Sequence, residues 1–90
     1  MNIAGLSTNY VAMRNLVENV SPRLVFLTET HIVHEDAFNQ YHIPGYKVAF
    51  CLSHSRHTGG VALYARESIK FNIRVNEAVE NNWFLGISVE

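Results

Sequence analysis

Residues 24–31, LVFLTETH, place a carboxylate directly after an apolar run. Residues 24–27 need a core, and such uninterrupted runs are typical of strands that are buried on both faces. Glu29 does not belong in a core unless something binds it. Two interpretations are open at this point: the strand has ended and Glu29 is solvated, or the strand holds a carboxylate at its C-terminal end for chemistry.

The first 28 residues predict a strand, a helix and a second strand. Residues 2–6, NIAGL, are typical of a short strand, and residues 24–28 of another. Between these two strands, apolar side chains recur at helical spacing and predict an amphipathic helix: Tyr10, Met13, Leu16, Val17 and Val20. The candidate N-caps are Ser7, Thr8 and Asn9. Pro22 is expected to end the helix, because proline disfavours helical geometry in the residue before it. The order predicts a compact βαβ unit with parallel strands.

The middle of the chain predicts irregular structure and then a hairpin. Within residues 31–45, the HEDAF segment suits a single helical turn and IPGY suits a turn. Residues 46–52 and residues 61–65 are apolar runs on either side of a polar loop, SHSRHT, at residues 53–58. Two strands around a short polar loop predict an antiparallel hairpin.

Two further strands are expected near the end of the chain. Residues 69–75, IKFNIRV, alternate between apolar and polar side chains and predict a half-exposed strand, and residues 83–89 predict a last strand. The fold class is therefore α/β, a βαβ unit plus an antiparallel hairpin and further strand. Leu24–Leu27 and Val61–Tyr64 are expected to be central and mostly buried, because their apolar runs are uninterrupted.

Composition limits the function classes. The chain has 90 residues, is 48% hydrophobic and 17% charged, and has a formal net charge of −1. This composition excludes a disordered tail, and the charge makes no electrostatic case for nucleic-acid binding beyond a local basic site. The single cysteine, Cys51, cannot form an internal disulfide and fits a reducing compartment. No signal-peptide pattern or membrane-spanning apolar run is present, so no membrane partner is expected.

Glu29 and Asn2 are the candidate metal ligands. Each is expected near the carboxyl end of one of the two parallel strands, and ligands bind outside those ends in open α/β sheets. A carboxylate and an amide oxygen brought together in this way suit Mg²⁺, which prefers oxygen ligands. The alternatives are a solvated strand-end Glu29 and an Asn2 in a frayed terminus.

Several segments in order resemble the endonuclease/exonuclease/phosphatase superfamily. They are NIAGL, LVFLTETH, IPGY, TGGVALYAR and ENNWFLGISVE. More closely, they resemble the N-terminal part of the apurinic-type endonuclease domain of non-LTR retrotransposons. The resemblance implies a deoxyribonuclease-like α/β sandwich and Mg²⁺-dependent phosphodiester cleavage of DNA. It also implies that Asn2 and Glu29 face the catalytic metal and the scissile phosphate.

The same resemblance implies that much of the family's chemistry is absent from these 90 residues. The family's later GDFN and SDH segments, which supply an aligning Asp and a phosphate-pairing His, do not occur here. The chain also stops inside an apolar strand. We therefore expect residues 1–90 to be a partial domain that lacks the C-terminal catalytic half, is inactive alone and self-associates through an uncovered apolar face. A parent retroelement protein would act in the nucleus.

Two alternatives to the retrotransposon endonuclease remain open. One is a phosphatase-branch member of the same superfamily, acting on phosphoinositides or other small phosphates. The other is a non-enzymatic remnant or interaction module derived from a retroelement. Fold alone does not separate these alternatives, because function depends on the site.

The remaining polar candidates carry weaker signals. Arg56 and His57 in the SHSRHT loop suit a contact to a DNA phosphate, or simply a solvated hairpin tip, because one Arg supplies little counterion release. His31, His34 and His42 lack the helix or cysteine spacing of a zinc site.

Three further features are assigned to structure. Cys51, Trp83 and Phe84 are expected in the core, and base stacking is the weaker interpretation of the two aromatic side chains. Gly59-Gly60 is expected to serve backbone geometry rather than a phosphate cradle, since no helix follows it.

Overall fold

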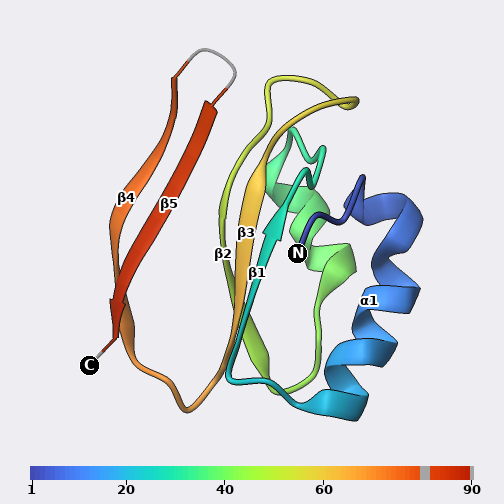
Figure 1. The fold of residues 1–90 in the computed structure, drawn as a ribbon, viewed down its shortest axis with the longest axis vertical. Coiled ribbons are helices and arrows are strands. Elements are labelled where there is room, and N and C mark those ends of the chain that lie inside the picture. Colours follow the sequence, from blue (N-terminus) through green and yellow to red (C-terminus); the bar gives the residue numbers. More distant parts are fainter. Residues whose placement is uncertain (80–81, 90) are drawn as a thin grey trace.

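A three-stranded antiparallel sheet separates two helices from a β-hairpin (Figure 1). The computed structural model describes residues 1–79 and 82–89. The elements in chain order are α1 (Leu6–Val20), β1 (Leu24–Thr28), the 3₁₀ helix η1 (Glu35–Tyr41), β2 (Tyr46–Cys51), β3 (Val61–Arg66), β4 (Phe71–Val79) and β5 (Asn82–Val89).

β3 lies at the centre of the sheet, and its two neighbours β1 and β2 run antiparallel to it. Leu63 of β3 is opposite Phe26 of β1 and Ala49 of β2. The hairpin predicted from the two apolar runs is therefore confirmed as β2–β3. β4 and β5 form a second antiparallel hairpin. The predicted α/β class is also confirmed.

A short parallel pairing at the N-terminus completes the predicted βαβ unit. Asn2 and Thr28 form a parallel bridge, and the Thr28 N–H donates to the Met1 carbonyl at 2.8 Å. α1 connects the two paired segments. The first strand is shorter than the predicted 2–6, because Ala4 and Gly5 have φ values of 48° and 98° and turn the chain into α1.

The start of α1 differs from the sequence prediction. The helix begins at Leu6 with Gly5 as N-cap, and no side chain caps it, so the prediction of Ser7, Thr8 or Asn9 as N-cap was wrong. The turn at Gly5 brings the chain into helical geometry earlier than the polar residues indicated. The Asn9 side-chain amide instead donates to the Ile3 carbonyl at 2.8 Å. The helix ends before Pro22, as expected.

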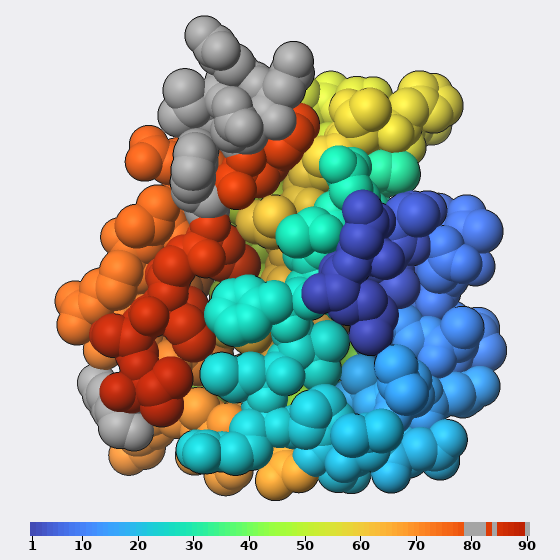
Figure 2. All heavy atoms as spheres, in the orientation of Figure 1, coloured from blue at the N-terminus to red at the C-terminus, as the bar shows by residue number. Residues whose placement is uncertain are grey.

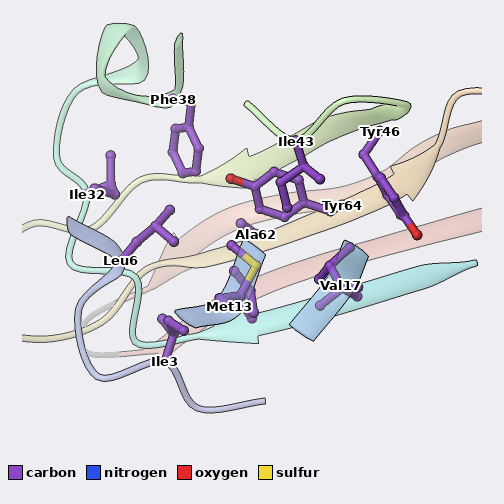
Figure 3. Packing of buried hydrophobic residues seen from close by; sticks show 12 residues of the cluster. Ile3, Leu6, Met13, Val17, Ile32, Phe38, Ile43, Tyr46, Ala62 and Tyr64 are labelled. Atoms are coloured by element: carbon purple, nitrogen blue, oxygen red, sulfur yellow. The ribbon is translucent and has the colours of Figure 1, made fainter. Parts of the chain in front are cut away.

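One face of the sheet packs against α1 and η1 and forms the main core (Figure 3). Its buried members are Ile3, Leu6, Met13, Val17, Val25, Leu27, Ile32, Phe38, Ile43, Tyr46, Ala62 and Tyr64. The buried Tyr64 hydroxyl donates to the Tyr41 carbonyl at 2.6 Å. Burial raises the pKa of Tyr64, and the nearby Tyr10 and Tyr41 raise it further. Leu16 and Val20 of the predicted apolar stripe are exposed instead.

The β4–β5 hairpin covers part of the other face of the sheet. Leu63, Ala49 and Cys51 are buried there, which confirms Cys51 as a core residue. Two side chains of the hairpin donate hydrogen bonds to the sheet: Trp83 Nε1 to the Leu52 carbonyl at 3.0 Å and Asn76 Nδ2 to the Phe50 carbonyl at 2.9 Å.

β1 corrects part of the burial prediction. Val61–Tyr64 lie in the central strand and are largely buried, as expected, but β1 is an outer strand of the three-stranded sheet. Its side chains alternate, so that Val25 and Leu27 enter the core while Phe26 is 45% exposed. The uninterrupted run in residues 24–27 therefore does not mark a strand that is covered on both faces.

An apolar surface remains exposed around β1 and the end of α1. It includes Met1, Leu16, Val20 and Phe26, and several of these residues line a groove of about 440 Å³. Figure 2 shows the N-terminal residues and β1 side by side on the viewed face, with β5 beyond them. No helix in the described part of the chain is both long enough and apolar enough to cross a membrane.

Candidate metal centre

Glu29 follows β1 in a segment whose backbone is fixed from both sides. On one side, the Gly5 N–H donates to the Glu29 carbonyl at 2.8 Å and the Leu6 N–H to the Thr30 carbonyl at 2.9 Å. On the other side, the His31 N–H donates to the Gly59 carbonyl at 2.9 Å. Glu29 and His31 have φ values of 58° and 59°, an uncommon backbone region for non-glycine residues. The strand therefore ends in a held, irregular turn that presents the carboxylate.

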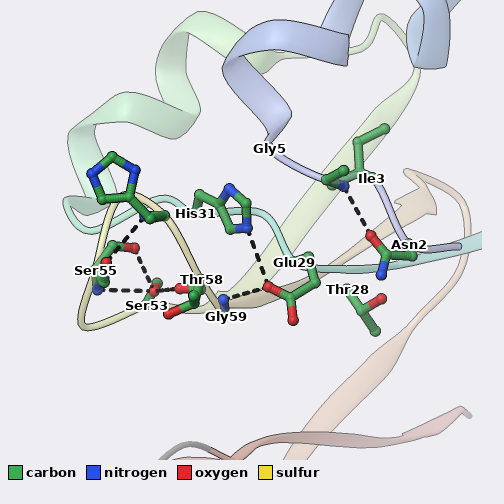
Figure 4. Close-up of polar contacts among 12 residues, drawn as sticks. Asn2, Ile3, Gly5, Thr28, Glu29, His31, Ser53, Ser55, Thr58 and Gly59 are labelled. Atoms are coloured by element: carbon green, nitrogen blue, oxygen red, sulfur yellow. Dashed lines mark hydrogen bonds and ion pairs between the residues drawn. The ribbon is translucent and has the colours of Figure 1, made fainter.

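One oxygen of the Glu29 carboxylate accepts two hydrogen bonds. Oε2 accepts from the Gly59 N–H at 2.5 Å and lies 3.1 Å from His31 Nε2 (Figure 4). Within the described residues, Oε1 makes no hydrogen bond. The Glu29 side chain is 40% exposed and the His31 side chain 21% exposed. A partly solvated carboxylate with one free oxygen is able to bind a cation.

The Gly59-Gly60 pair brings the backbone amide to this carboxylate. Both glycines have positive φ values, 79° and 85°. A Cβ at Gly59 would lie 2.2 Å from the Trp83 ring, and a Cβ at Gly60 would lie 2.4 Å from Thr30 Oγ1. The pair therefore serves close backbone approach, in line with its predicted role in backbone geometry.

Asn2 lies beside Glu29 in the fold but is engaged locally. Its bridge partner Thr28 immediately precedes Glu29. The Asn2 side chain is exposed, and its Oδ1 accepts a hydrogen bond from the Ala4 N–H at 3.0 Å (Figure 4). An amide oxygen has a second lone pair, so this bond leaves it able to bind a metal. Joint ligation by Asn2 and Glu29 stays a prediction.

These two residues form a minimal donor set for Mg²⁺. The described residues contain no group of three or more His, Cys, Asp and Glu side chains that could hold a metal. Mg²⁺ usually binds one or two carboxylates and completes its shell with water and substrate phosphates, so one carboxylate and one amide fit it weakly. Zinc structural sites use four Cys or His ligands, and His31, His34 and His42 do not gather into such a group.

The loop after β2 brings Arg56 to a groove that His31 also lines. Arg56 lines a groove of about 270 Å³ together with His31, His34 and the first turn of α1. Ser53 Oγ holds the loop: it lies within hydrogen-bond distance of the carbonyls of Ser55 and Thr58, which share its single proton, and it accepts a hydrogen bond from the Ser55 N–H at 3.1 Å. His57 is exposed at the tip and does not line this groove. The structure thus brings Arg56, but not His57, to the groove beside His31.

The sequence did not identify the partners of Glu29. His31 follows Glu29 by two residues, the spacing that places strand side chains on one face, and this signal was available. To predict the Gly59 amide as a partner, the pairing of β1 with β3 must be known. This pairing aligns Thr28 with Val61 and so brings the glycines before Val61 opposite the end of β1. Trp83 is half-buried and is not among the buried core residues; it packs against Gly59, and its ring lies 5.9 Å from that of His54. The side chain of Phe84 lies outside the part of the chain that the structure describes.

A solved nuclease has a similar fold. The AP endonuclease LMAP from Leishmania major matches with a TM-score of 0.63 and 22% sequence identity, over 88% of this chain and 28% of that chain. This likeness supports an AP-endonuclease-like α/β fold. The chain thus spans little more than a quarter of the length of that enzyme. No protein-family model and no curated protein matches the chain.

Proposed function

We propose that this chain forms the N-terminal part of a Mg²⁺-dependent DNA endonuclease domain, with Glu29 and Asn2 as metal ligands. The observation that carries the proposal is the Glu29 carboxylate, which is fixed through one oxygen while the other is open, one residue after the Asn2–Thr28 bridge. The likeness to an AP endonuclease supports the same reading of the fold.

The chemistry depends on a metal bound by oxygen donors. Glu29 Oε1 and Asn2 Oδ1 would hold the ion, and a bound Mg²⁺ stabilises charge on a phosphate oxygen during phosphodiester cleavage. Arg56 would contact a neighbouring phosphate from the rim of the groove that it shares with His31. His57 is a second, more distant candidate for a phosphate contact, because it is exposed on the same loop.

The chain alone is proposed to bind the metal weakly and not to cleave DNA. The donor set is one carboxylate and one amide, and the aligning Asp and phosphate-pairing His that the family resemblance implies are absent from the sequence. Mg²⁺ dependence, the retrotransposon type and DNA as the substrate all belong to this proposal. A phosphatase of the same superfamily is the alternative, and it would leave the role of Glu29 unchanged.

The exposed apolar surface favours a second property, self-association. Val20 is 65% exposed, and it lines the apolar groove with Phe26 and Met1. Contiguous apolar patches of this kind mark interaction surfaces in soluble proteins. We therefore propose that copies of this chain associate through this surface. A non-enzymatic interaction module would use the same surface and would need no metal.

The metal role is tested by titrating Mn²⁺ into the chain and following free Mn²⁺ by electron paramagnetic resonance. The proposal expects one weak site that is lost in Glu29→Gln and weakened in Asn2→Ala. Glu18→Gln is the matched control, because Glu18 is an exposed carboxylate on α1 whose partner is Arg14. Equal binding by the wild type and Glu29→Gln would contradict the metal role.

The DNA role needs a separate measurement. Fluorescence anisotropy with a short labelled duplex should show weak, salt-dependent binding that decreases in Arg56→Ala. Binding that is unchanged by Arg56→Ala would remove this residue from the proposed interface. Binding of inositol phosphates in preference to the duplex would favour the phosphatase alternative.

A further inference from the structure

We infer that His31 is a positioning residue for Glu29, and that together with the Gly59 amide it makes Glu29 a ligand through Oε1 alone. The metal part of this inference rests on the proposed function, whereas the positioning part concerns only residues of this chain. Neither the resemblance nor the comparison assigns a role to this imidazole.

The two hydrogen bonds converge on a single oxygen. Gly59 N lies 2.5 Å from Glu29 Oε2, and His31 Nε2 lies 3.1 Å from the same atom. The terminal torsion of a glutamate is otherwise broad, so a carboxylate with one hydrogen bond can still reorient. Two donors from different directions remove this freedom. The free oxygen, Oε1, then has one orientation. A cation would therefore be bound by Oε1 alone, in a monodentate rather than a bidentate manner.

The imidazole is itself held in place. The His31 backbone donates to the Gly59 carbonyl at 2.9 Å, so the residue is tied to the same loop as the other donor. A Cβ at Gly5 would lie 3.3 Å from His31 Nδ1, which shows how closely the ring packs against the start of α1. An ionised carboxylate only accepts hydrogen bonds, so Nε2 is the donor and Nδ1 faces Gly5.

His34 provides an internal comparison. It lines the same groove as His31 and is exposed, but it makes no hydrogen bond to Glu29. If any imidazole in this groove affected the Glu29 carboxylate, substitution of either histidine would have an effect. A positioning role involves His31 alone.

The test compares three single variants of the full chain. His31→Asn removes the contact, because its amide is too short to reach Oε2, and Asn tolerates the left-handed backbone at this position. His31→Gln restores a donor at about the reach of Nε2, although Gln suits that backbone less well. His34→Asn is the control. Circular dichroism and thermal unfolding establish that each variant is folded.

The first readout needs no metal. A hydrogen bond to a carboxylate moves an amide proton downfield, so the Gly59 amide proton should move upfield in Glu29→Gln and in His31→Asn. It should stay near its wild-type position in His31→Gln and His34→Asn. A Gly59 resonance unchanged in His31→Asn would overturn the inference, whether or not the chain binds a metal.

The second readout is Mn²⁺ affinity. Loss of a group that orients a metal ligand typically costs about 10–100-fold in affinity, and we expect a loss in this range for His31→Asn. His31→Gln should recover most of the lost affinity. His34→Asn should bind Mn²⁺ within about twofold of the wild type, because His34 does not orient a metal ligand. Wild-type affinity in His31→Asn would overturn the inference. If the wild type binds no Mn²⁺ while the Gly59 resonance shifts as expected, the proposed function fails and the positioning role stands.

Discussion

Trp83 of β5 lies directly over Gly59, so closely that a Cβ on this glycine would come within 2.2 Å of the indole ring. The same indole donates its N–H to the Leu52 carbonyl at 3.0 Å. The β4–β5 hairpin therefore touches the loop whose amide binds Glu29. A residue in the last strand thus supports the geometry of a carboxylate near the beginning of the chain.

Gly59→Ala should destabilise the protein more than Gly45→Ala. Both glycines have a positive φ, 79° and 83°, but a Cβ at Gly45 would meet nothing within 4 Å. Gly45→Ala should therefore cost only the backbone strain, about 1 kcal/mol. Gly59→Ala adds the displacement of Trp83 and should cost roughly 2–4 kcal/mol in total. Urea unfolding measures both, and equal losses would show that Trp83 does not restrict position 59.

Tyr64→Phe should reduce the alkaline sensitivity of the fold. The pKa of Tyr64 is raised in the folded state by burial, so the unfolded chain loses its phenol proton first as the pH rises above about 10. Stability therefore falls with pH in that range for the wild type. Tyr64→Phe should be less stable by about 1 kcal/mol at neutral pH, because the Tyr41 carbonyl loses its donor.

The measurement is urea unfolding at several pH values between about 8 and 11, a range that begins below the ordinary tyrosine pKa. The wild-type free energy of unfolding should converge on that of Tyr64→Phe as the pH rises. Parallel curves for the two proteins would contradict the assignment of the pKa shift to Tyr64.

Polar substitution of the exposed apolar surface should weaken self-association. Phe26→Ser and Val20→Ser each remove an apolar side chain from the groove near the N-terminus. Val11→Ser is the matched control, because Val11 is also an exposed apolar residue of α1 but does not line the groove. Sedimentation velocity should show a larger monomer fraction for the first two variants only. Monomeric wild-type protein at high concentration would rule out the association.

The chain should fail to nick supercoiled plasmid in excess Mg²⁺. Absence of a general acid–base group costs about 10²–10⁴ in rate. Absence of an electrostatic stabiliser costs about a further 10²–10³, which together puts turnover below detection. Glu29→Ala is run in parallel. Nicking by the wild type that disappears in Glu29→Ala would show that residues 1–90 form an enzyme on their own.

Much of the fold could be predicted from short-range patterns. The presence of α1, the stop at Pro22 and the runs of β2 and β3 depend on local preferences and were found where expected, although Leu16 and Val20 of the predicted apolar stripe are exposed. The start of α1 and the exposure of Phe26 depend on tertiary features. Gly5 takes the cap position through a turn in which Ala4 and Gly5 both have positive φ values, and Phe26 lies on an outer strand of the sheet.

The site was predictable only in part. Glu29 was chosen as a candidate ligand from its place after an apolar strand, and Asn2 from its place in the first strand of a βαβ unit, and both roles stay predictions. The hydrogen bonds from Gly59 and His31 arise from left-handed backbone geometry and from the pairing of β1 with β3. The spacing of two residues between Glu29 and His31 is visible in the sequence, whereas the Gly59 contact follows from neither propensity nor spacing.

The most direct test of the central claim, that Glu29 binds a divalent cation, is paramagnetic broadening by Mn²⁺ in ¹H–¹⁵N spectra of the full chain. Substoichiometric Mn²⁺ should selectively broaden amide signals near the carboxylate, including those of Gly59, Thr30 and Asn2, and Glu29→Gln should abolish the effect. Glu35 and Asp36 of η1 provide an internal comparison, because they are exposed carboxylates elsewhere on the chain. Broadening centred on η1, or an unchanged pattern in Glu29→Gln, would contradict the account.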